Sequence, residues 1–336
     1  MNILALESSC DETAAAVVRS GRTVLSSVIA SQADMHAIYG GVVPEIASRK
    51  HVEAIVPLAG QALERAGLTM SDLDAIAVTY APGLIGAVLV AVNFAKAAAF
   101  ALNIPLIPVH HVRGHIAANY LTHADLEPPF ICLCVSGGTT AIVHVRDHTD
   151  MEVLGATRDD AAGECFDKTA RVLGLGYPGG GPLDRLSQDG DDSRYSFPRA
   201  SVHDHPLDMS FSGLKTAVLN LIHNTQQKGE QLDLPGLAAS FSAAVSDSLV
   251  PRVMEAVRMT GCRRVAAAGG VAANSRIRAD LERACRKGGC ALWLPELALC
   301  GDNAAMIGCQ GYYEYLAGHT AGMELNAYAN RDIGRG

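Results

Sequence analysis

Residues 2–18, NILALESSCDETAAAVV, carry the pattern that decides the fold: a strand, a polar turn and a second strand. The apolar run 2–6 is followed by the turn 7–13, and apolar runs then resume at 14–18 and 23–30. Short apolar runs bounded by turn residues predict strands. We therefore expect three consecutive strands at the start of the chain.

The same pattern returns in residues 130–145, FICLCVSGGTTAIVHV. This copy predicts a strand, a turn and two further strands, at 130–135, 136–140, 141–146 and 151–157. Helical periodicity follows each copy, at 45–66 in the first and at 163–173 in the second. A duplication of this kind predicts two related α/β halves, with Glu127-Pro128-Pro129 as the linker between them.

The composition is that of an ordinary globular α/β protein, because 49% of the 336 residues are hydrophobic and 18% are charged. The longest apolar stretch, 84–102, contains Asn93 and Lys96, so we expect a buried helix there and no membrane span. The nine cysteines are odd in number and contain no C-x-x-C pair. Reduced thiols and a cytoplasmic location are expected from this pattern.

The net charge of −8 argues against a protein that coats nucleic acid through bulk electrostatics. A local basic surface is compatible with this charge, and Arg49 and Lys50 are candidates for it. The alternative for these two residues is a solvated helix face.

Two histidines in PVHHVRGH, residues 108–115, form a candidate metal site. On a helix, His111 and His115 share one face, and two imidazole nitrogens with a carboxylate suit a transition metal. Val112 stands where the H-E-x-x-H metalloproteases have their catalytic glutamate, so peptidase chemistry lacks its base. The alternative is a pair of hydrogen-bonded histidines. Asp302, before an apolar helix, is either a third ligand or an N-cap.

Three polar or glycine-rich turns are candidates for ligand binding. The turn Ser136-Gly137-Gly138 and the turn Gly269-Gly270 allow close approach of the backbone to a phosphate, although each is also explained as a tight turn. The second turn opens a helix within a βαβ element, which adds the helix dipole. Asp11 and Glu12 are candidates to orient a metal or water or to act as a base, and capping of their own turn is the alternative.

Together these motifs resemble the bacterial tRNA N6-adenosine threonylcarbamoyltransferases, the TsaD or Gcp family, formerly described as O-sialoglycoprotein endopeptidases. The resemblance covers nearly the whole chain, through ALESSCDETAAAVV, GGVVPEIASRKH, HHVRGH, VSGG, FDKTARVLGLGYPGG, FSGLKTAV, GGVAANSRIR, DNAAMIG and ELNAYAN. Two positions depart from the family pattern. Thr139 replaces a common histidine, and Gly181-Pro182 stands where many members have the proline one position earlier.

The resemblance implies a two-lobed α/β fold of the ASKHA type (actin, sugar kinase, Hsp70-like), with duplicated halves and a cleft between the lobes. We expect an N-terminal lobe of residues 1–127, completed by a C-terminal helix at 303–325. Residues 128–302 are expected to form the C-terminal lobe.

The resemblance also implies the reaction and its residues. A threonylcarbamoyl group would pass from threonylcarbamoyl-adenylate to the N6 amine of the adenosine 3′ of the anticodon, in tRNAs that read ANN codons, with release of AMP. His111, His115 and Asp302 would hold one divalent metal, iron or alternatively zinc. The substrate would be bound by Cys134, Val135, Ser136, Gly137, Gly138, Asp167, Gly180, Asp184 and Asn274. Asp11 or Glu12 is our candidate to accept the proton of the amine.

The implied partners are a non-catalytic paralogue of the TsaB type, a small ATPase of the TsaE type and an adenylate-forming synthase of the TsaC type. Two other functions compete with this one. An ATPase or small-molecule kinase of the ASKHA fold is disfavoured by His111 and His115, because such kinases normally rely on magnesium and carboxylates. A non-catalytic scaffold is disfavoured because both histidines and Asp302 are present.

Overall fold

The computed structural model describes residues 1–203 and 205–334, and the chain divides into two compact units. Unit 1 contains Met1–Pro128, Val145–Glu152 and the chain from Pro295 onward. Unit 2 contains Pro129–His144 and Val153–Leu294.

Unit 1 is built on a five-stranded sheet with the order β3-β2-β1-β4-β5. Its strands are β1 (Asn2–Glu7), β2 (Glu12–Arg19), β3 (Thr23–Ser31), β4 (Ala75–Ala81) and β5 (Leu106–His110). The first three strands pair antiparallel, whereas β1, β4 and β5 run parallel. The helices of this unit are α1 (Ala33–Ala37), α2 (Pro44–Ala66), α3 (Ile85–Leu102), α4 (His111–Thr122) and α10 (Ala304–Leu316).

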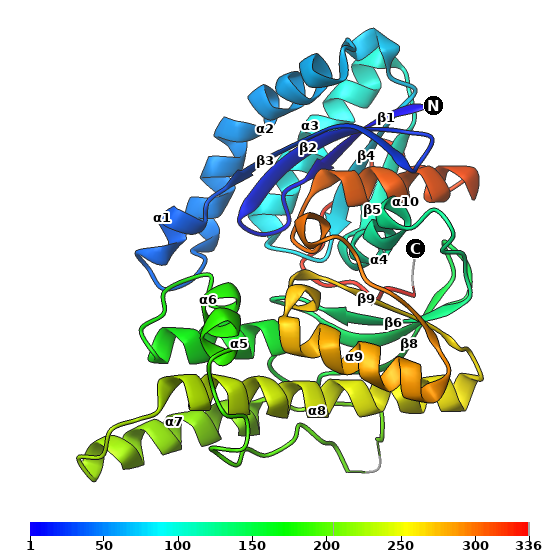
Figure 1. The fold of residues 1–336 in the computed structure, drawn as a ribbon. Helices are drawn as coiled ribbons and strands as arrows, with labels where there is room; N and C mark the ends of the chain where they lie inside the picture. The colour runs from blue at the N-terminus through cyan, green and yellow to red at the C-terminus, as the bar shows by residue number, and fades with distance from the viewer. Residues whose placement is uncertain (204, 335–336) are drawn as a thin grey trace. The chain divides into compact units, whose positions relative to one another are not determined.

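Alternation along the strands gives the unit 1 sheet two buried faces. Leu4 and Leu6 of β1 pack in a core with residues of α2 and α3. Ile3 and Ala5 point to the opposite face and pack against α10, because successive strand side chains alternate between the two faces. Figure 1 shows α2 and α3 on one side of this sheet and α4 and α10 on the other.

The apolar helix α3 belongs to this core. By length and composition it is the one described helix that is apolar enough to cross a membrane, with a mean hydropathy of 2.0. One of its faces, including Val88, Val92 and Ala95, is buried against the sheet and α2. Lys96 donates to the carbonyl of Leu325, 3.0 Å away. Only this face is buried, about a third of the helix, so α3 is a core helix with one exposed side and not the buried helix that was predicted.

Unit 2 repeats this arrangement, with the sheet order β10-β9-β6-β7-β8. Its strands are β6 (Phe130–Val135), β7 (Thr140–Val145), β8 (Met151–Ala156), β9 (Arg264–Ala268) and β10 (Ala291–Trp293). Its helices are α5 (Ala162–Val172), α6 (Gly180–Ser187), α7 (Ser212–Gln227), α8 (Leu234–Thr260) and α9 (Ser275–Gly288). Ile131, Leu133 and Val135 of β6 pack with residues of these helices in one core. When β1 to β5 are matched in order with β6 to β10, the two sheets have the same strand order, as the duplication predicts.

The division of the chain differs from the predicted lobes in two segments. Residues 145–152 and 295–302 pack in unit 1, although the sequence placed them in the C-terminal lobe. His148 stacks on Tyr313 with ring centroids 3.8 Å apart, and this contact holds the first segment. The amide of Glu296 donates to Thr122 Oγ1, 3.1 Å away, in the second.

The C-terminal helix is shorter than predicted. It ends at Leu316, where the sequence pattern had extended it to residue 325. Gly318 has a φ of +80°, a left-handed conformation that favours glycine and ends a helix. The segment 322–334 then runs back along unit 1, where the amide of Tyr328 donates to the carbonyl of Tyr80.

Candidate active site

Helix α4 brings the two predicted histidine ligands together. It begins directly after β5, so His111 occupies its first position and His115 follows one turn later. The two rings meet edge to face with centroids 4.6 Å apart. Both are largely buried, with side-chain exposures of 12% and 2%. The spacing of four residues therefore does place both imidazoles on one helix face.

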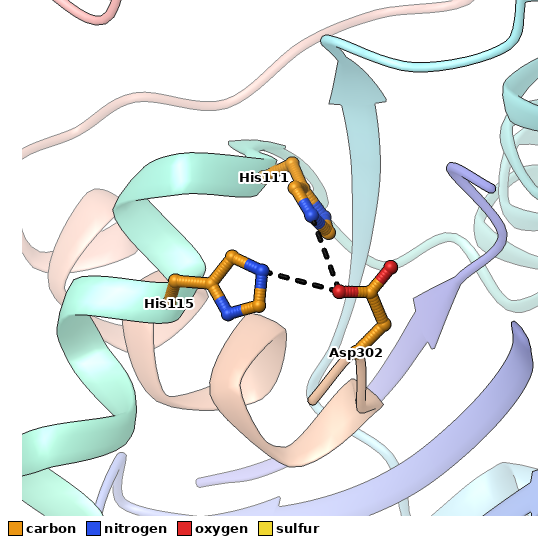
Figure 2. Close-up of side chains that lie close together, drawn as sticks. All are labelled: His111, His115 and Asp302. Carbon is orange, nitrogen blue, oxygen red and sulfur yellow. Dashed lines mark ion pairs between the residues drawn. The ribbon is translucent and has the colours of Figure 1, made fainter. Parts of the chain in front are cut away.

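Asp302 comes to these histidines from a distant part of the sequence. Its Oδ1 lies 3.1 Å from His115 Nε2 and 3.5 Å from His111 Nε2 (Figure 2). The alternative role of Asp302 as an N-cap is wrong. Asn303 is the N-cap of α10, because its Oδ1 accepts from the amide of Met306 at 2.9 Å. Asp302 is therefore left to face the two imidazoles.

A glycine allows α4 and α10 to pack closely enough for this convergence. A Cβ on Gly114 would lie 2.6 Å from Ile307 Cδ1 and 3.4 Å from Met306 Cγ. The first distance is shorter than any ordinary carbon contact, so a larger residue at 114 would displace the end of the Ile307 side chain. Gly114 in HHVRGH thus leaves room for Ile307 and Met306 of the helix that follows Asp302.

Glu7 is a site residue that the sequence analysis missed. It lies at the end of β1 and is fully buried, and its Oε2 is 2.9 Å from His111 Nδ1. Thr79 Oγ1 donates to the same oxygen at 2.5 Å, and the amide of Ser9 donates to Oε1 at 2.5 Å. A carboxylate on Nδ1 fixes the ring and its tautomer, which leaves Nε2 to face Asp302. The one signal in the sequence was a buried charge interrupting an apolar strand.

The charges of His111, Glu7 and Asp302 shift one another's pKa values. Burial disfavours charge on His111, but Glu7 and Asp302 outweigh burial and raise the pKa of the imidazole well above its usual value. Burial likewise opposes ionisation of the two carboxyls, yet His111 lowers the pKa of both Glu7 and Asp302. The protein alone therefore holds a positive imidazolium between two negative carboxylates.

This donor set fits a divalent metal. One nitrogen from each histidine and one oxygen from Asp302 all lie within 4.8 Å of one another. His115 Nε2 is buried and, among the described residues, has no well-aligned hydrogen-bond partner, although Asp302 is close. A divalent cation would satisfy this nitrogen and would balance two carboxylates with both imidazoles neutral.

The predicted acid-base candidates lie in the turn after β1. Asp11 is buried, and Glu12 begins β2 with its Oε1 accepting from Ser31 Oγ at 3.0 Å. Burial, followed by the charges of Asp11 and Asp302, raises the pKa of Glu12 from 4.5 to about 8. The carboxyl of Glu12 thus exchanges its proton near neutral pH, which suits an acid-base group.

Unit 2 contains a pocket of about 270 Å³ that gathers five of the predicted substrate residues. They are Gly137, Asp167, Gly180, Asp184 and Asn274. The other lining residues are Gly163, Phe166, Pro178, Gly181, Gly270, Val271 and Ala273. The lining combines apolar surface, glycine backbone and two carboxylates.

Polar contacts organise the loops around this pocket. Asp167 Oδ1 accepts from the amide of Gly179 at 2.8 Å, which fixes the glycine-rich loop before α6. Asp184 accepts from the amide and hydroxyl of Ser275, at 3.1 and 2.9 Å. Asn274 is the N-cap of α9 and accepts from the amide of Ile277 at 3.0 Å. Asp184 and Asn274 therefore hold the start of α9 at the pocket.

Four predicted substrate residues are not part of the pocket lining in the described chain. Cys134 and Val135 are buried inside strand β6. Ser136 is used within its own turn, where it accepts from the amide of Thr139 at 3.2 Å. Gly138 lies beside the lining residue Gly137 but is not itself in contact with the pocket. The sequence motif marks the end of the strand correctly, but only its glycine at 137 reaches the pocket.

The second glycine turn differs from the expected helix start. Residues Gly270–Ala273 form a short 3₁₀ turn, and α9 begins only at Ser275. Gly269 has a φ of +93°, and a Cβ there would lie 2.3 Å from the carbonyl oxygen of Val135. Glycine at 269 is thus needed for close packing against β6, whereas Gly270 faces the pocket.

The candidate basic surface does not carry an excess of positive charge. Arg49 lies 3.6 Å from Glu45 on α2, and Lys50 lies 2.6 Å from Glu53. All four side chains are substantially exposed. These pairs favour the alternative of a solvated helix face.

The fold has relatives among solved structures. The HypF of T. kodakarensis matches 95% of this chain and 48% of its own with a TM-score of 0.66 and 16% identity. Component A of the Acidaminococcus fermentans (R)-2-hydroxyglutaryl-CoA dehydratase matches 94% of this chain and 97% of its own with a TM-score of 0.54 and 16% identity. Both are ASKHA-fold proteins, so the predicted α/β fold is confirmed. At this identity the likeness shows the fold alone.

Sequence relatives are much closer. A tRNA N6-adenosine threonylcarbamoyltransferase of Clostridium botulinum strain 657 is 52% identical over 334 residues, 99% of this chain and 98% of the relative. One of Clostridium perfringens strain 13 is 53% identical over 332 residues with the same coverage. A family model described as TsaD, tRNA N6-adenosine threonylcarbamoyltransferase, matches residues 23–309. The chain therefore belongs to the TsaD family of tRNA N6-adenosine threonylcarbamoyltransferases.

Proposed function

We propose that this chain transfers a threonylcarbamoyl group from threonylcarbamoyl-adenylate to the N6 amine of the adenosine 3′ of the anticodon, in tRNAs that read ANN codons, with release of AMP. The observation that carries the proposal is the convergence of His111, His115 and Asp302 within 4.8 Å in a member of this transferase family. A non-catalytic paralogue would have no need of these three donors.

The unit 2 pocket is the proposed site for the adenylate. Its apolar side chains, such as Phe166 and Val271, suit the adenine ring, and its carboxylates suit the ribose hydroxyls. Gly137 exposes backbone, which suits the phosphate because no Cβ keeps it at a distance. The bond cleaved in transfer is the one between the carbamoyl carbon and this phosphate, and AMP leaves with the electron pair.

His111, His115 and Asp302 are the proposed ligands of one divalent metal, iron or alternatively zinc, since two histidines and a carboxylate serve both ions. When bound, the metal supplies Lewis acidity that stabilises negative charge on a carbonyl or phosphate oxygen. Glu7 holds His111 in the tautomer that directs Nε2 to the metal.

The adenosine amine must lose a proton when it attacks the carbamoyl carbon. Glu12 is the proposed acceptor: with a pKa of about 8 it is ionised in only a minor fraction of molecules at neutral pH, but that ionised fraction is a stronger base than an ordinary carboxylate. Asp11 supports this role through its negative charge, which is one of the causes of the raised pKa. In this proposal both residues act as a pair and not as separate bases.

The proposed setting is the cytoplasm, with tRNA as substrate and three protein partners: a TsaB-like paralogue, a TsaE-like ATPase and a TsaC-like synthase. Exposed apolar side chains in unit 1 support a protein partner. Ile38 and Tyr39 are 82% and 57% exposed, and Val52 and Val56 on α2 are 62% and 61% exposed. Such residues are costly to leave in water, and we assign them to contact with the paralogue.

Reconstitution tests the proposed function. The purified chain, its three partners, threonine, bicarbonate, ATP and unmodified tRNA should yield the modified nucleoside, detected by mass spectrometry. A mixture in which Asp302→Asn replaces the wild-type chain should not. If the chain instead phosphorylated a small hydroxylated acceptor and left the tRNA unmodified, the kinase alternative would hold.

A further inference from the structure

The residues of HHVRGH that lie on helix α4 include one on the face opposite the two metal ligands. An α-helix advances about 100° per residue, so Arg113 points away from the side shared by His111 and His115. His110, the last residue of β5, is also not a ligand. Both are buried, with exposures of 2% for Arg113 and 3% for His110. Buried polar side chains need partners, and these partners identify the role of the two residues.

Arg113 binds the C-terminal segment of the chain. Its Nε and Nη2 both donate to the carbonyl oxygen of Ile333, at 2.9 and 2.8 Å. His110 Nε2 lies 3.1 Å from the carbonyl oxygen of Arg331. Two non-ligand residues of the motif thus hold two carbonyls of the same segment.

The remaining arginine donor connects α4 to α10. Arg113 Nη1 lies 2.9 Å from Glu314 Oε1, and both side chains are almost completely buried. Gln310 donates to the same oxygen at 2.8 Å, and His319 Nδ1 lies 2.7 Å from the other oxygen of Glu314. Since α10 directly follows Asp302 and Asn303, Arg113 links the helix of two metal ligands to the helix beside the third.

The start of α4 depends on such side-chain contacts. Within the described chain, its N-cap His110 makes no side-chain capping hydrogen bond. The first turn of a helix has unpaired amides and frays when it is not capped. His111 lies in that turn, where Glu7 holds its ring directly and contacts of the neighbouring side chains help to hold its backbone.

The segment that Arg113 binds is itself anchored to the sheet. The amide of Tyr328 donates to the carbonyl of Tyr80, and the amide of Gly83 donates to the carbonyl of Ala329. Both contacts lie at the end of β4, next to the strand that leads into α4. The terminal motif ELNAYAN, residues 324–330, therefore supports a rigid attachment point for the arginine.

We propose that Arg113 is a positioning residue for the metal ligands, and that the C-terminal segment, residues 324–333, is the support through which it acts. The inference rests on the metal centre of the proposed function. Arg113 fixes the first turns of α4 against α10 and this segment, so that His111 and His115 keep their geometry toward Asp302. Without Arg113, metal binding must also order His111 and His115, and the cost of ordering them lowers the affinity for the metal.

The test is the dissociation constant of the metal-free, full-length protein for Co²⁺ and Zn²⁺, with the visible spectrum of bound Co²⁺ as a report on ligand geometry. Arg113→Gln should bind about 10-fold or more weakly, the scale found when groups that support metal ligands are removed. Arg113→Lys keeps the positive charge beside Glu314 but loses the pair of hydrogen bonds that the guanidinium donates to the carbonyl of Ile333. It should fall between wild type and Arg113→Gln, and it serves as the test variant if Arg113→Gln does not fold.

Arg22→Gln is the matched control. Arg22 also donates to main-chain carbonyls, those of Ala124 and Leu126, just beyond the opposite end of α4. This variant should lower the melting temperature without changing metal affinity. Wild-type affinity in the Arg113 variants, or equal weakening in Arg22→Gln, would overturn the positioning role. Failure of the wild-type chain to bind metal would instead refute the metal centre itself.

Discussion

Replacing Glu7 by glutamine should weaken metal binding although Glu7 is not a ligand. The carboxylate accepts on both oxygens: Oε2 takes His111 Nδ1 and Thr79 Oγ1, and Oε1 takes the amide of Ser9. A glutamine amide presents N–H groups on one side and must therefore turn a donor toward donors in either orientation. No rotamer of the glutamine preserves all three contacts.

Each orientation of the glutamine has a defined cost. With its NH₂ toward Ser9, a buried backbone amide loses its partner, which costs about 1–3 kcal/mol. With its NH₂ toward His111, the ring proton moves to Nε2 and blocks the atom that faces Asp302. Loss of such an orienting partner typically weakens metal binding 10- to 100-fold, or about 1.4–2.8 kcal/mol.

Titration of the metal-free Glu7→Gln protein with Zn²⁺ or Co²⁺, against a chelator of known affinity, measures this effect. Thr79→Val is the control, because it removes one donor to Glu7 and leaves the contact with His111 intact. It should change metal affinity less than Glu7→Gln does. Equal metal affinity of Glu7→Gln and wild type would show that Glu7 does not orient His111.

Three further outcomes are expected. His115→Ala should lower metal content at least about 10-fold by elemental analysis, and wild-type stoichiometry would place the site elsewhere. Gly137→Val or Gly270→Val should abolish calorimetric binding of a stable adenylate analogue, since a Cβ at either position meets no described atom within 4 Å and projects into open space; unchanged affinity in both would reject the pocket. With its pKa raised to about 8, Glu12 stays protonated in the fold while the unfolded chain ionises above pH 4.5, so stability falls as pH rises between these values. Metal-free Glu12→Gln should thus gain about 3 kcal/mol over wild type between pH 5 and pH 8 in urea unfolding, and a pH-independent difference would contradict this.

Local patterns predicted the sheets well because each strand carries its own turn signals. Phe130–Val135 was predicted to the residue, and the duplication predicted two related halves, which agrees with the strand order that the two sheets share. The unit boundaries were not predictable in the same way. Segment 145–152 lies in unit 1 because His148 stacks on Tyr313, a contact between residues far apart in sequence.

In the candidate site, too, the sequence predicted contacts between near neighbours better than contacts between residues far apart in the chain. The four-residue spacing predicted that His111 and His115 share a face, whereas the pattern around Asp302 left it as either a third ligand or an N-cap, and only the family resemblance implied the ligand. Glu7 was missed because nothing in its own strand shows that its partner is a histidine 104 residues away. Cys134 and Val135 were included through a motif of which only Gly137, in the turn after β6, lines the pocket.

Direct transfer from a defined donor tests the central claim. Synthetic threonylcarbamoyl-adenylate, labelled in the carbamoyl carbon, would be mixed with the metal-loaded chain, its paralogue and ATPase partners and unmodified tRNA, without the synthase. Mass spectrometry of the digested tRNA should show the label on the adenosine 3′ of the anticodon and release of AMP in equal amount. Hydrolysis of the adenylate to AMP with no label on tRNA, under conditions in which a related transferase of the family labels the same tRNA, would contradict the proposed transfer.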